Sequence, residues 1–336
     1  MLKFLQCNFC LHLWHNFIQI LQMRILIITL FSLFFLQKIQ AQTIASEDKK
    51  QLKKLESFMQ IQADSIINSQ DWMMRFASDR ELIQVLVQAL KVKNSFYYNF
   101  DSLQISKVYA PDSSFKIFTW QVMKDFSYYR QRGAIQMRTT DGSLKLFPLF
   151  DASDFTERPT DSVRQADKWI GAIYYKIVLK TYNNKKVYTL LGSDENNERT
   201  NKKWIDILTF DDEGKPQFGR NCFVYPNDGF KPAQPCYRFC IEYRKNGGVR
   251  VRYDEKLDEI IFDRLISEGN DPNTKSTLIP YGDYEGFKWT NGKWYFTAQP
   301  FDALDLEEKP KLMMKPILDN EEKKEKKRMD RFYKKN

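Results

Sequence analysis

The chain has 336 residues, of which 43% are hydrophobic and 15% aromatic, and its formal net charge is +9. This length and hydrophobic content can build one large or two medium cores, so we expect a globular protein. The charge lies at the two ends, because residues 1–42 contribute +3 and residues 309–336 contribute +6. Residues 43–308 are therefore close to neutral, and their charge gives no reason to expect nucleic-acid binding.

The N-terminal part of the chain has the pattern of a secretory signal peptide. In residues 23–42, Arg24 precedes twelve mostly apolar residues, and the small residue Ala41 lies near the end. A signal peptide has a charged start, a short apolar run and a small residue near the cleavage site, whereas a membrane-spanning helix needs about 20 apolar residues. We expect Met23 to start the signal peptide and residues 1–22 to be an upstream extension absent from the mature protein.

Before this segment, Cys7, Cys10, His12 and His15 lie within nine positions. A zinc module usually separates its two ligand pairs by a dozen or more residues, whereas His12 follows Cys10 by two. We therefore expect no metal site here. The two histidines are the only ones in the chain, so the mature protein is predicted to contain none. That excludes Ser-His-Asp and Cys-His catalysis and histidine metal sites, and it favours a protein without a cofactor.

Two amphipathic helices are predicted next. Apolar residues recur at spacings of three and four over residues 46–69, which indicates one helix. Residues 78–91 predict a second helix, with Ser78 and Glu81 in the positions of a capping box. Residues 43–100 are therefore expected to form a helical N-terminal layer.

After residue 96 the sequence takes the period of two that is typical of strands. Hairpin turns are predicted at Asp141-Gly142, Asn183-Asn184 and Asn291-Gly292, and within residues 203–219 and 241–253. Strands joined in this way are antiparallel neighbours. Residues 101–308 are thus predicted to form a large antiparallel β meander, curled or barrel-like, with an irregular propeller as the second possibility. The expected fold class is α+β, with the N-terminal helices packed on this sheet, and the absence of βαβ alternation argues against a doubly wound fold.

One predicted strand, residues 115–122, is apolar on both faces. Phe115 and Ile117 lie on one face, and Phe118 and Trp120 lie on the other. Such a strand has to be covered on both sides. We expect it to be central in its sheet.

Three cysteines lie in the predicted mature chain, and export makes disulfides possible. Cys236 and Cys240 are on one predicted strand, about 13 Å apart, which is too far for a bridge. A hairpin with residues 226–235 as its loop would bring Cys222 near Cys240. A Cys222–Cys240 disulfide with Cys236 left over and three buried free thiols are both consistent with the sequence.

The C-terminal residues 309–336 contain eleven Lys or Arg and five Asp or Glu. This composition is typical of a short charged helix or a solvated tail. A contact of the tail with anionic lipid or nucleic acid is the alternative interpretation.

Four stretches of the chain resemble a set of uncharacterised exported β-rich proteins of the phylum Bacteroidota. They are "PDSSFKIFTWQV", "GAIYYKIV", "YTLLGSDENNERTNKKWIDILTF" and "GDYEGFKWTNGKWYF". The resemblance covers most of residues 43–300. It implies a cell-envelope setting, periplasmic or extracellular, and a β-rich body, and it brings no site residues with it.

Few residue patterns indicate chemistry. The loop "SDENNE", residues 193–198, resembles the start of a calcium loop but lacks its glycine and its closing Glu, so it is interpreted as a polar loop. The sequence contains no glycine loop of the phosphate-binding type. Carboxylates placed among aromatic residues are Asp206, Asp283 and Glu285. Trp289 and Trp294, on either side of a hairpin turn, are the candidate ligand-facing aromatics.

These observations predict an exported, non-enzymatic envelope or interaction protein whose partner is an unidentified protein or glycan. No cofactor, no nucleic acid and no transmembrane segment in the mature form are expected. The first alternative is a glycan hydrolase that uses two carboxylates. The second is a binder of anionic surfaces that acts through the C-terminal tail.

Overall fold

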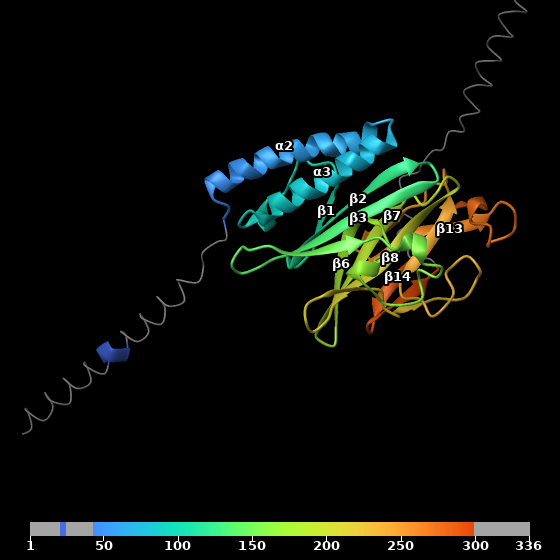
Figure 1. Cartoon of the computed structure of the whole chain (residues 1–336). Coiled ribbons are helices and arrows are strands. Elements are labelled where there is room, and N and C mark those ends of the chain that lie inside the picture. The colour runs from blue at the N-terminus through green and yellow to red at the C-terminus, as the bar shows by residue number, and fades with distance from the viewer. Residues whose placement is uncertain (1–20, 25–42, 299–336) are drawn as a thin grey trace, which may run out of the picture. The chain divides into compact units, whose positions relative to one another are not determined.

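The computed structural model describes residues 21–24 and 43–298 (Figure 1). The N-terminal Cys/His cluster and the basic tail of residues 309–336 lie outside these residues, and so does nearly all of the expected signal peptide. Within the described chain the protein combines helices with mainly antiparallel sheets, in agreement with the predicted α+β class.

The described chain divides into two compact units. The first contains residues 43–104 and 136–146, and the second contains residues 105–135 and 147–298. Both long helices belong to the first unit, and most strands belong to the second.

The first unit is built around two helices and a short 3-10 turn, α2 (Ser46–Asn68), α3 (Trp72–Lys91) and η1 (Ser95–Tyr97). The predicted helix is confirmed, and its buried apolar residues lie on one face: Leu52, Met59, Ala63 and Ile66. Glu56 is buried on the same helix because its carboxylate accepts hydrogen bonds from the Tyr98 hydroxyl at 2.6 Å and the Ser102 amide at 2.7 Å.

The second helix begins earlier than its predicted capping box. Asp71 is the N-cap, and its side chain accepts a hydrogen bond from the Met73 amide at 2.9 Å. Ser78, the expected cap, is buried inside α3 and hydrogen bonds to Ser65 of α2 at 2.9 Å. Because Asp71 already satisfies an N-terminal amide and no helix breaker follows it, the helix includes residues 72–78, about two turns that the capping pattern leaves out.

Fifteen strands form three sheets in the described part of the chain. The first sheet consists of β1 (Ser106–Tyr109), β2 (Phe115–Asp125), β3 (Tyr128–Met137) and β4 (Lys145–Phe150), in that order. The second has the order β5 (Arg164–Gln165), β9 (Pro216–Phe218), β8 (Thr200–Phe210), β7 (Lys185–Asp194), β6 (Ile173–Tyr182), and β11 (Phe239–Arg244) also pairs with β8. The third has the order β10 (Phe223–Val224), β15 (Lys293–Thr297), β14 (Leu278–Thr290), β13 (Glu259–Ser267), β12 (Val251–Asp254). Short 3-10 turns lie between strands: η2 (Ser153–Phe155), η3 (Ala166–Lys168) and η4 (Lys275–Thr277).

The predicted single meander is therefore wrong in its extent, because three sheets take its place and the described strands form no closed barrel. The hairpin turns at Asn183-Asn184 and Asn291-Gly292 are confirmed, and all four residues have positive φ. The hairpin of β8 and β9 is confirmed as well. The strand at residues 115–122 is buried on both faces, as predicted.

Two predicted hairpins do not form. β11 pairs with β8 and β12 pairs with β13, so residues 241–253 are not a hairpin. Phe223 pairs in parallel with Trp294 instead of with the strand that contains Cys240. β11 pairs with β8 instead of with its sequence neighbours because β8 has an unpaired edge. β9 pairs only with residues 208–210, which leaves residues 200–205 available to β11.

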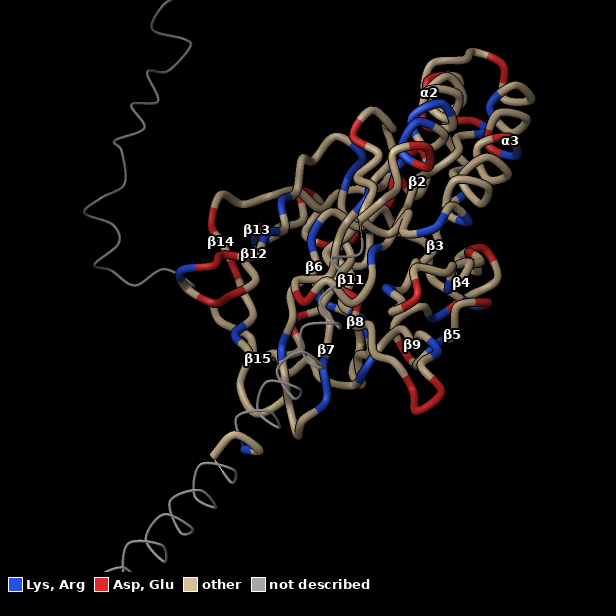
Figure 2. The backbone as a smooth tube through the Cα atoms, turned by 90° about the vertical axis from the view of Figure 1, so that its left-hand side faces the viewer, with Lys and Arg blue, Asp and Glu red and all other residues tan. Residues whose placement is uncertain are grey.

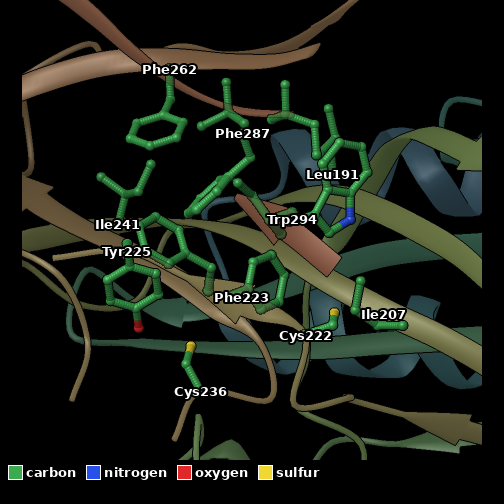
Figure 3. Packing of buried hydrophobic residues seen from close by; sticks show 14 of the residues in the cluster. Leu191, Ile207, Cys222, Phe223, Tyr225, Cys236, Ile241, Phe262, Phe287 and Trp294 are labelled. Atoms are coloured by element: carbon green, nitrogen blue, oxygen red, sulfur yellow. The ribbon is translucent and has the colours of Figure 1, made fainter. Parts of the chain in front are cut away.

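The core of the second unit lies between the second and third sheets (Figure 3). Phe287 of β14 is fully buried, and its ring is 4.9 Å from that of Phe239, 5.4 Å from Phe262 and 5.5 Å from Phe223. Trp294 is also fully buried, and its indole N–H donates a hydrogen bond to Thr189 of β7 at 3.0 Å. Burial of these aromatic side chains holds the two sheets together.

The hairpin turn at Gly292 allows a test of this packing. A Cβ at Gly292 would lie 2.6 Å from ring atoms of Tyr182, and Gly292 has a φ of +78°. We expect Gly292→Ala to lower the free energy of unfolding by about 2–4 kcal/mol. Gly248→Ala, at a φ of +67° with nothing within 4 Å, is the control and should cost about 1 kcal/mol. Equal losses in urea denaturation would contradict the close contact with Tyr182.

Candidate functional site

A cavity of about 390 Å³ opens between the second and third sheets. Its apolar wall is formed by Phe230, Phe239, Ile241, Phe262, Leu265 and Phe296. Its charged lining residues are Asp228, Lys231, Asp263, Arg264 and Glu285. We refer to this site as the Phe-lined cavity.

The apolar wall is a continuation of the core. Phe239 and Phe262 are almost fully buried and belong to the same cluster as Phe287, and Figure 3 shows Phe262 and Ile241 within it. The register between β13 and β14 shifts between Asp263 and Leu265. A β-bulge turns side chains out of the alternating pattern, which explains why consecutive residues of β13 line one cavity.

Lys231 lies at the centre of the charged side of the cavity. Its ammonium donates hydrogen bonds to Asp228 and, at 3.3 Å, to Oε1 of Glu285, and it forms an ion pair with Oε2 of Glu285 at 3.1 Å. It also lies 4.5 Å from the ring centroid of Phe296. The side chains of Lys231 and Glu285 are only 5% and 14% exposed, so this pairing takes place largely out of water. We call Asp228, Lys231 and Glu285 the Lys231 cluster.

The Lys231 cluster keeps Asp228 ionised. Burial acts to raise the pKa of Asp228, but the hydrogen bond and charge of Lys231 outweigh it, and the pKa lies below its usual range. The backbone amides of Phe230 and Lys231 also donate to this carboxylate, at 3.0 and 3.2 Å. Asp228 is therefore a poor proton donor at neutral pH.

The lining carries more negative than positive charge. Two carboxylates share the single ammonium of Lys231, and Asp263 adds a third carboxylate. The Arg264 side chain is exposed, with its guanidinium 5.4 Å from the ring centroid of Tyr281. Over the second unit as a whole, Figure 2 shows basic and acidic positions interspersed along the strands, so the excess negative charge is a local property of the cavity.

The predicted carboxylates lie in three different environments. Glu285 lines the Phe-lined cavity, whereas the neighbouring Asp283 is exposed and lies outside its lining. Asp206 is buried in a polar network, where it accepts hydrogen bonds from Arg238 and Tyr174 at 3.3 Å each. Burial raises the pKa of Asp206, and the charge of Arg238 offsets part of that effect. Asp206 thus contributes to stability instead of facing a substrate.

The two tryptophans proposed as ligand-facing aromatics pack against each other at 5.1 Å. Trp294 is in the core, and Trp289 is partly buried against the same cluster. The structure therefore places the aromatic rings that face a cavity elsewhere, on Phe230, Phe262 and Phe296.

Cys222, Cys236 and Cys240 are all free thiols in this structure, so the Cys222–Cys240 bridge is not formed. Cys222 precedes the strand that pairs with β15, whereas Cys240 is on β11 and lines the cavity. Burial raises the pKa of Cys222 to about 12 and that of Cys236 to about 11. Thiols with such pKa values are poor nucleophiles, because the thiolate is the reactive form.

The acidic loop of residues 193–198 is held by hydrogen bonds. Asp194 accepts from the Asn196 amide at 2.8 Å and from the Gln131 side chain at 2.9 Å. Among residues 21–24 and 43–298, no group of three His, Cys, Asp or Glu side chains is placed to hold a metal ion. The loop connects β7 to β8.

A second hollow, of about 920 Å³, surrounds the turn at Asn183-Asn184. Its lining includes Tyr182 and Arg220, and the guanidinium of Arg220 lies 5.7 Å from the Tyr182 ring centroid. Tyr182 also contacts Gly292 closely. Tyr188 and Phe210 also line this hollow, and their rings pack against each other at 6.1 Å. Its aromatic rings are thus already engaged, and the Phe-lined cavity with its buried charges is the stronger candidate site.

Sequence reasoning identified Glu285 but missed Asp228, Phe230 and Lys231. These residues lie in "PNDGFKPAQP", which has the composition of a loop and was expected to be the tip of a hairpin. The available signal was an Asp and a Lys three residues apart with a Phe between them. Their partner Glu285 is 54 residues away from Lys231, and that pairing depends on the tertiary fold.

The chain matches no known protein family, no curated protein and no solved structure. None of the helices in the described part of the chain is long and apolar enough to cross a membrane.

The buried Asp206–Arg238 pair is expected to be costly to break. Arg238→Met leaves a buried carboxylate without its ion partner and should lower the free energy of unfolding by about 3–5 kcal/mol at pH 7. The double variant Asp206→Asn/Arg238→Met should be more stable than Arg238→Met alone, because it removes the orphaned charge. Arg252→Met, which breaks a more exposed pair with Asp254, is the control and should cost less than about 1 kcal/mol. A double variant no more stable than Arg238→Met in urea denaturation would contradict the charge argument.

Asp194 is expected to make stability depend on pH. Burial raises its pKa to about 6, so the folded state binds a proton more tightly than the unfolded state. The stability of the natural protein should therefore fall as pH rises from about 4 to about 6, by about 2 kcal/mol relative to Asp194→Asn. The Asn oxygen can still accept both hydrogen bonds of Asp194. Glu198→Gln removes an exposed charge from the same loop and controls for net charge. If the free energies of unfolding of Asp194→Asn and the natural protein change in parallel with pH, the account of Asp194 is wrong.

Proposed function

We propose that the protein is an exported, non-enzymatic binding protein of the cell envelope that holds a small molecule, or a small group of a larger partner, in the Phe-lined cavity. The observation that carries the proposal is the cavity itself. Its volume of about 390 Å³ lies in the range of small-molecule sites, and it combines an apolar wall with a few converging buried charges. Export is supported by the signal-peptide pattern of residues 23–42 and by the resemblance to exported proteins.

The charged groups of the cavity favour binding over hydrolysis. A glycoside hydrolase of the retaining type has two carboxyl groups about 5–5.5 Å apart, one of which must be protonated to act as the acid. Asp228 and Glu285 are close together, since both accept hydrogen bonds from one nitrogen. That nitrogen, the ammonium of Lys231, occupies the space between them and stabilises the ionised form of Asp228.

A protein or glycan partner remains compatible with this proposal if it presents a small group to the cavity. Binding of anionic surfaces through the tail of residues 309–336 is a separate proposal that concerns residues outside the described chain. The Phe-lined cavity gives no support to it, because its lining carries an excess of carboxylates.

Binding of a neutral aromatic probe to the full chain tests the proposed function. Benzyl alcohol is much smaller than the cavity, and apolar cavities of about 150 Å³ bind benzene. We expect saturable binding in ligand-observed NMR with a Kd in the millimolar range. Ile266→Trp fills the cavity and should weaken this binding at least tenfold, which corresponds to about 1.4 kcal/mol.

Tyr295→Trp is the matched control, because Tyr295 is exposed and lies next to Phe296 on the other face of β15. It should leave the affinity for benzyl alcohol unchanged. Thermal unfolding of both variants shows whether they are folded. An affinity that is the same in the natural protein, Ile266→Trp and Tyr295→Trp, or no binding at all, would overturn the proposed function.

A further inference from the structure

We propose that the Phe-lined cavity recognises an organic cation, that is, an ammonium group carried on an apolar body. This inference rests on the proposed function and specifies its ligand class. Three features of the lining carry it: the balance of charge, the aromatic faces, and the ammonium that the cavity already holds.

The lining carboxylates have lone pairs that are not used by the cations of the protein. Asp228, Asp263 and Glu285 line the cavity, and Lys231 is the one buried cation among its lining residues. One oxygen of Asp263 accepts a hydrogen bond from the Arg250 amide at 2.6 Å, and its other oxygen accepts none from the residues that the structure describes. An ionised carboxylate has about four lone-pair positions, and the Lys231 ammonium donates one hydrogen bond to Glu285, at Oε1. The lining has three carboxylates against Lys231 and Arg264, so one more positive charge would neutralise it, whereas an anion would add to its excess of negative charge.

The aromatic wall suits a cation as well as an apolar body. The face of a phenyl ring is electronegative, and it attracts an ammonium within about 6 Å of its centroid, most strongly where water is excluded. Phe230, Phe262 and Phe296 bring such rings to the carboxylates. Phe has no hydroxyl, so the wall itself offers a ligand dispersion and cation–π contacts and no hydrogen bonds.

Lys231 shows this mode of binding within the protein. Its ammonium lies 4.5 Å from the Phe296 centroid and donates to Asp228 and Glu285. An ammonium between a phenyl face and carboxylates is therefore an arrangement that this cavity already stabilises. A ligand ammonium is expected to take the equivalent position beside Glu285, on the side that Lys231 does not occupy.

Three probes of one shape but different charge test the inference on the full chain. Benzylamine, benzyl alcohol and benzoate carry charges of about +1, 0 and −1 at pH 7 on the same ring. We expect benzylamine to bind at least tenfold more tightly than benzyl alcohol in calorimetric or NMR titrations, and benzoate to bind more weakly than both.

Two variants locate the charge that is responsible. Glu285→Gln and Asp263→Asn keep the shape of the lining and remove one carboxylate each, and each should reduce the preference for benzylamine over benzyl alcohol to about threefold or less. Glu268→Gln removes an exposed carboxylate that pairs with Arg244 outside the cavity, and it should leave the preference unchanged. The use of two cavity variants keeps the test valid if one of them is poorly folded.

The possible outcomes separate this inference from the proposed function. Benzyl alcohol and benzylamine binding with equal affinity, both weakened by Ile266→Trp, would overturn the cation inference and retain the binding site. Tightest binding of benzoate would overturn the inference in favour of an anion site. A preference for benzylamine that persists in both Glu285→Gln and Asp263→Asn would also overturn it. Failure of all three probes to bind would overturn both proposals.

Discussion

The packing of Phe287 between two sheets is the constraint on which the second unit depends. This ring is fully buried and lies within 6.3 Å of five other aromatic rings, which belong to both sheets and to the segment that precedes β11. Trp294 adds a buried hydrogen bond from β15 to β7. Both sheets bury their apolar faces in this cluster. The pairing of β10 with β15 brings Phe223 into the cluster, and the pairing of β11 with β8 brings Phe239 into it.

Two groups of buried charges border this core, the Asp206–Arg238 network and the Lys231 cluster. They differ in whether their hydrogen-bonding groups are all used within the protein. Arg238 is fully buried, and its hydrogen bonds go to Asp206 and to backbone carbonyls, including that of Phe218 at 3.0 Å. The hydrogen bonds of Arg238 are thus made within the protein, and they tie the β11 region to β8 and β9. The Lys231 cluster faces an open cavity, with more carboxylate than ammonium. The first arrangement stabilises the fold, whereas the second leaves capacity for a ligand.

Local features of the sequence predicted local structure well. The turns at Asn183-Asn184 and Asn291-Gly292 depend only on residues that tolerate positive φ, and the period of two located the strands. Which strand β11 joins depends on the free edge of β8, and no local pattern encodes that edge. The alternation of apolar and polar residues places Trp294 on one face of β15, but it does not indicate that this face is buried in the core. The site was predicted only through Glu285, because the bulge in β13 and the contact of Lys231 with Glu285 arise from tertiary packing.

We propose that a cation binds at the end of this aromatic core, in the Phe-lined cavity. The most direct measurement is a crystal structure of the full chain with benzylamine. We expect the phenyl ring against Phe262 and Phe296 and the amine within hydrogen-bonding distance of the Glu285 carboxylate. A benzylamine molecule that binds elsewhere, or that lies in the cavity with its amine directed to solvent, would rule out this cation site.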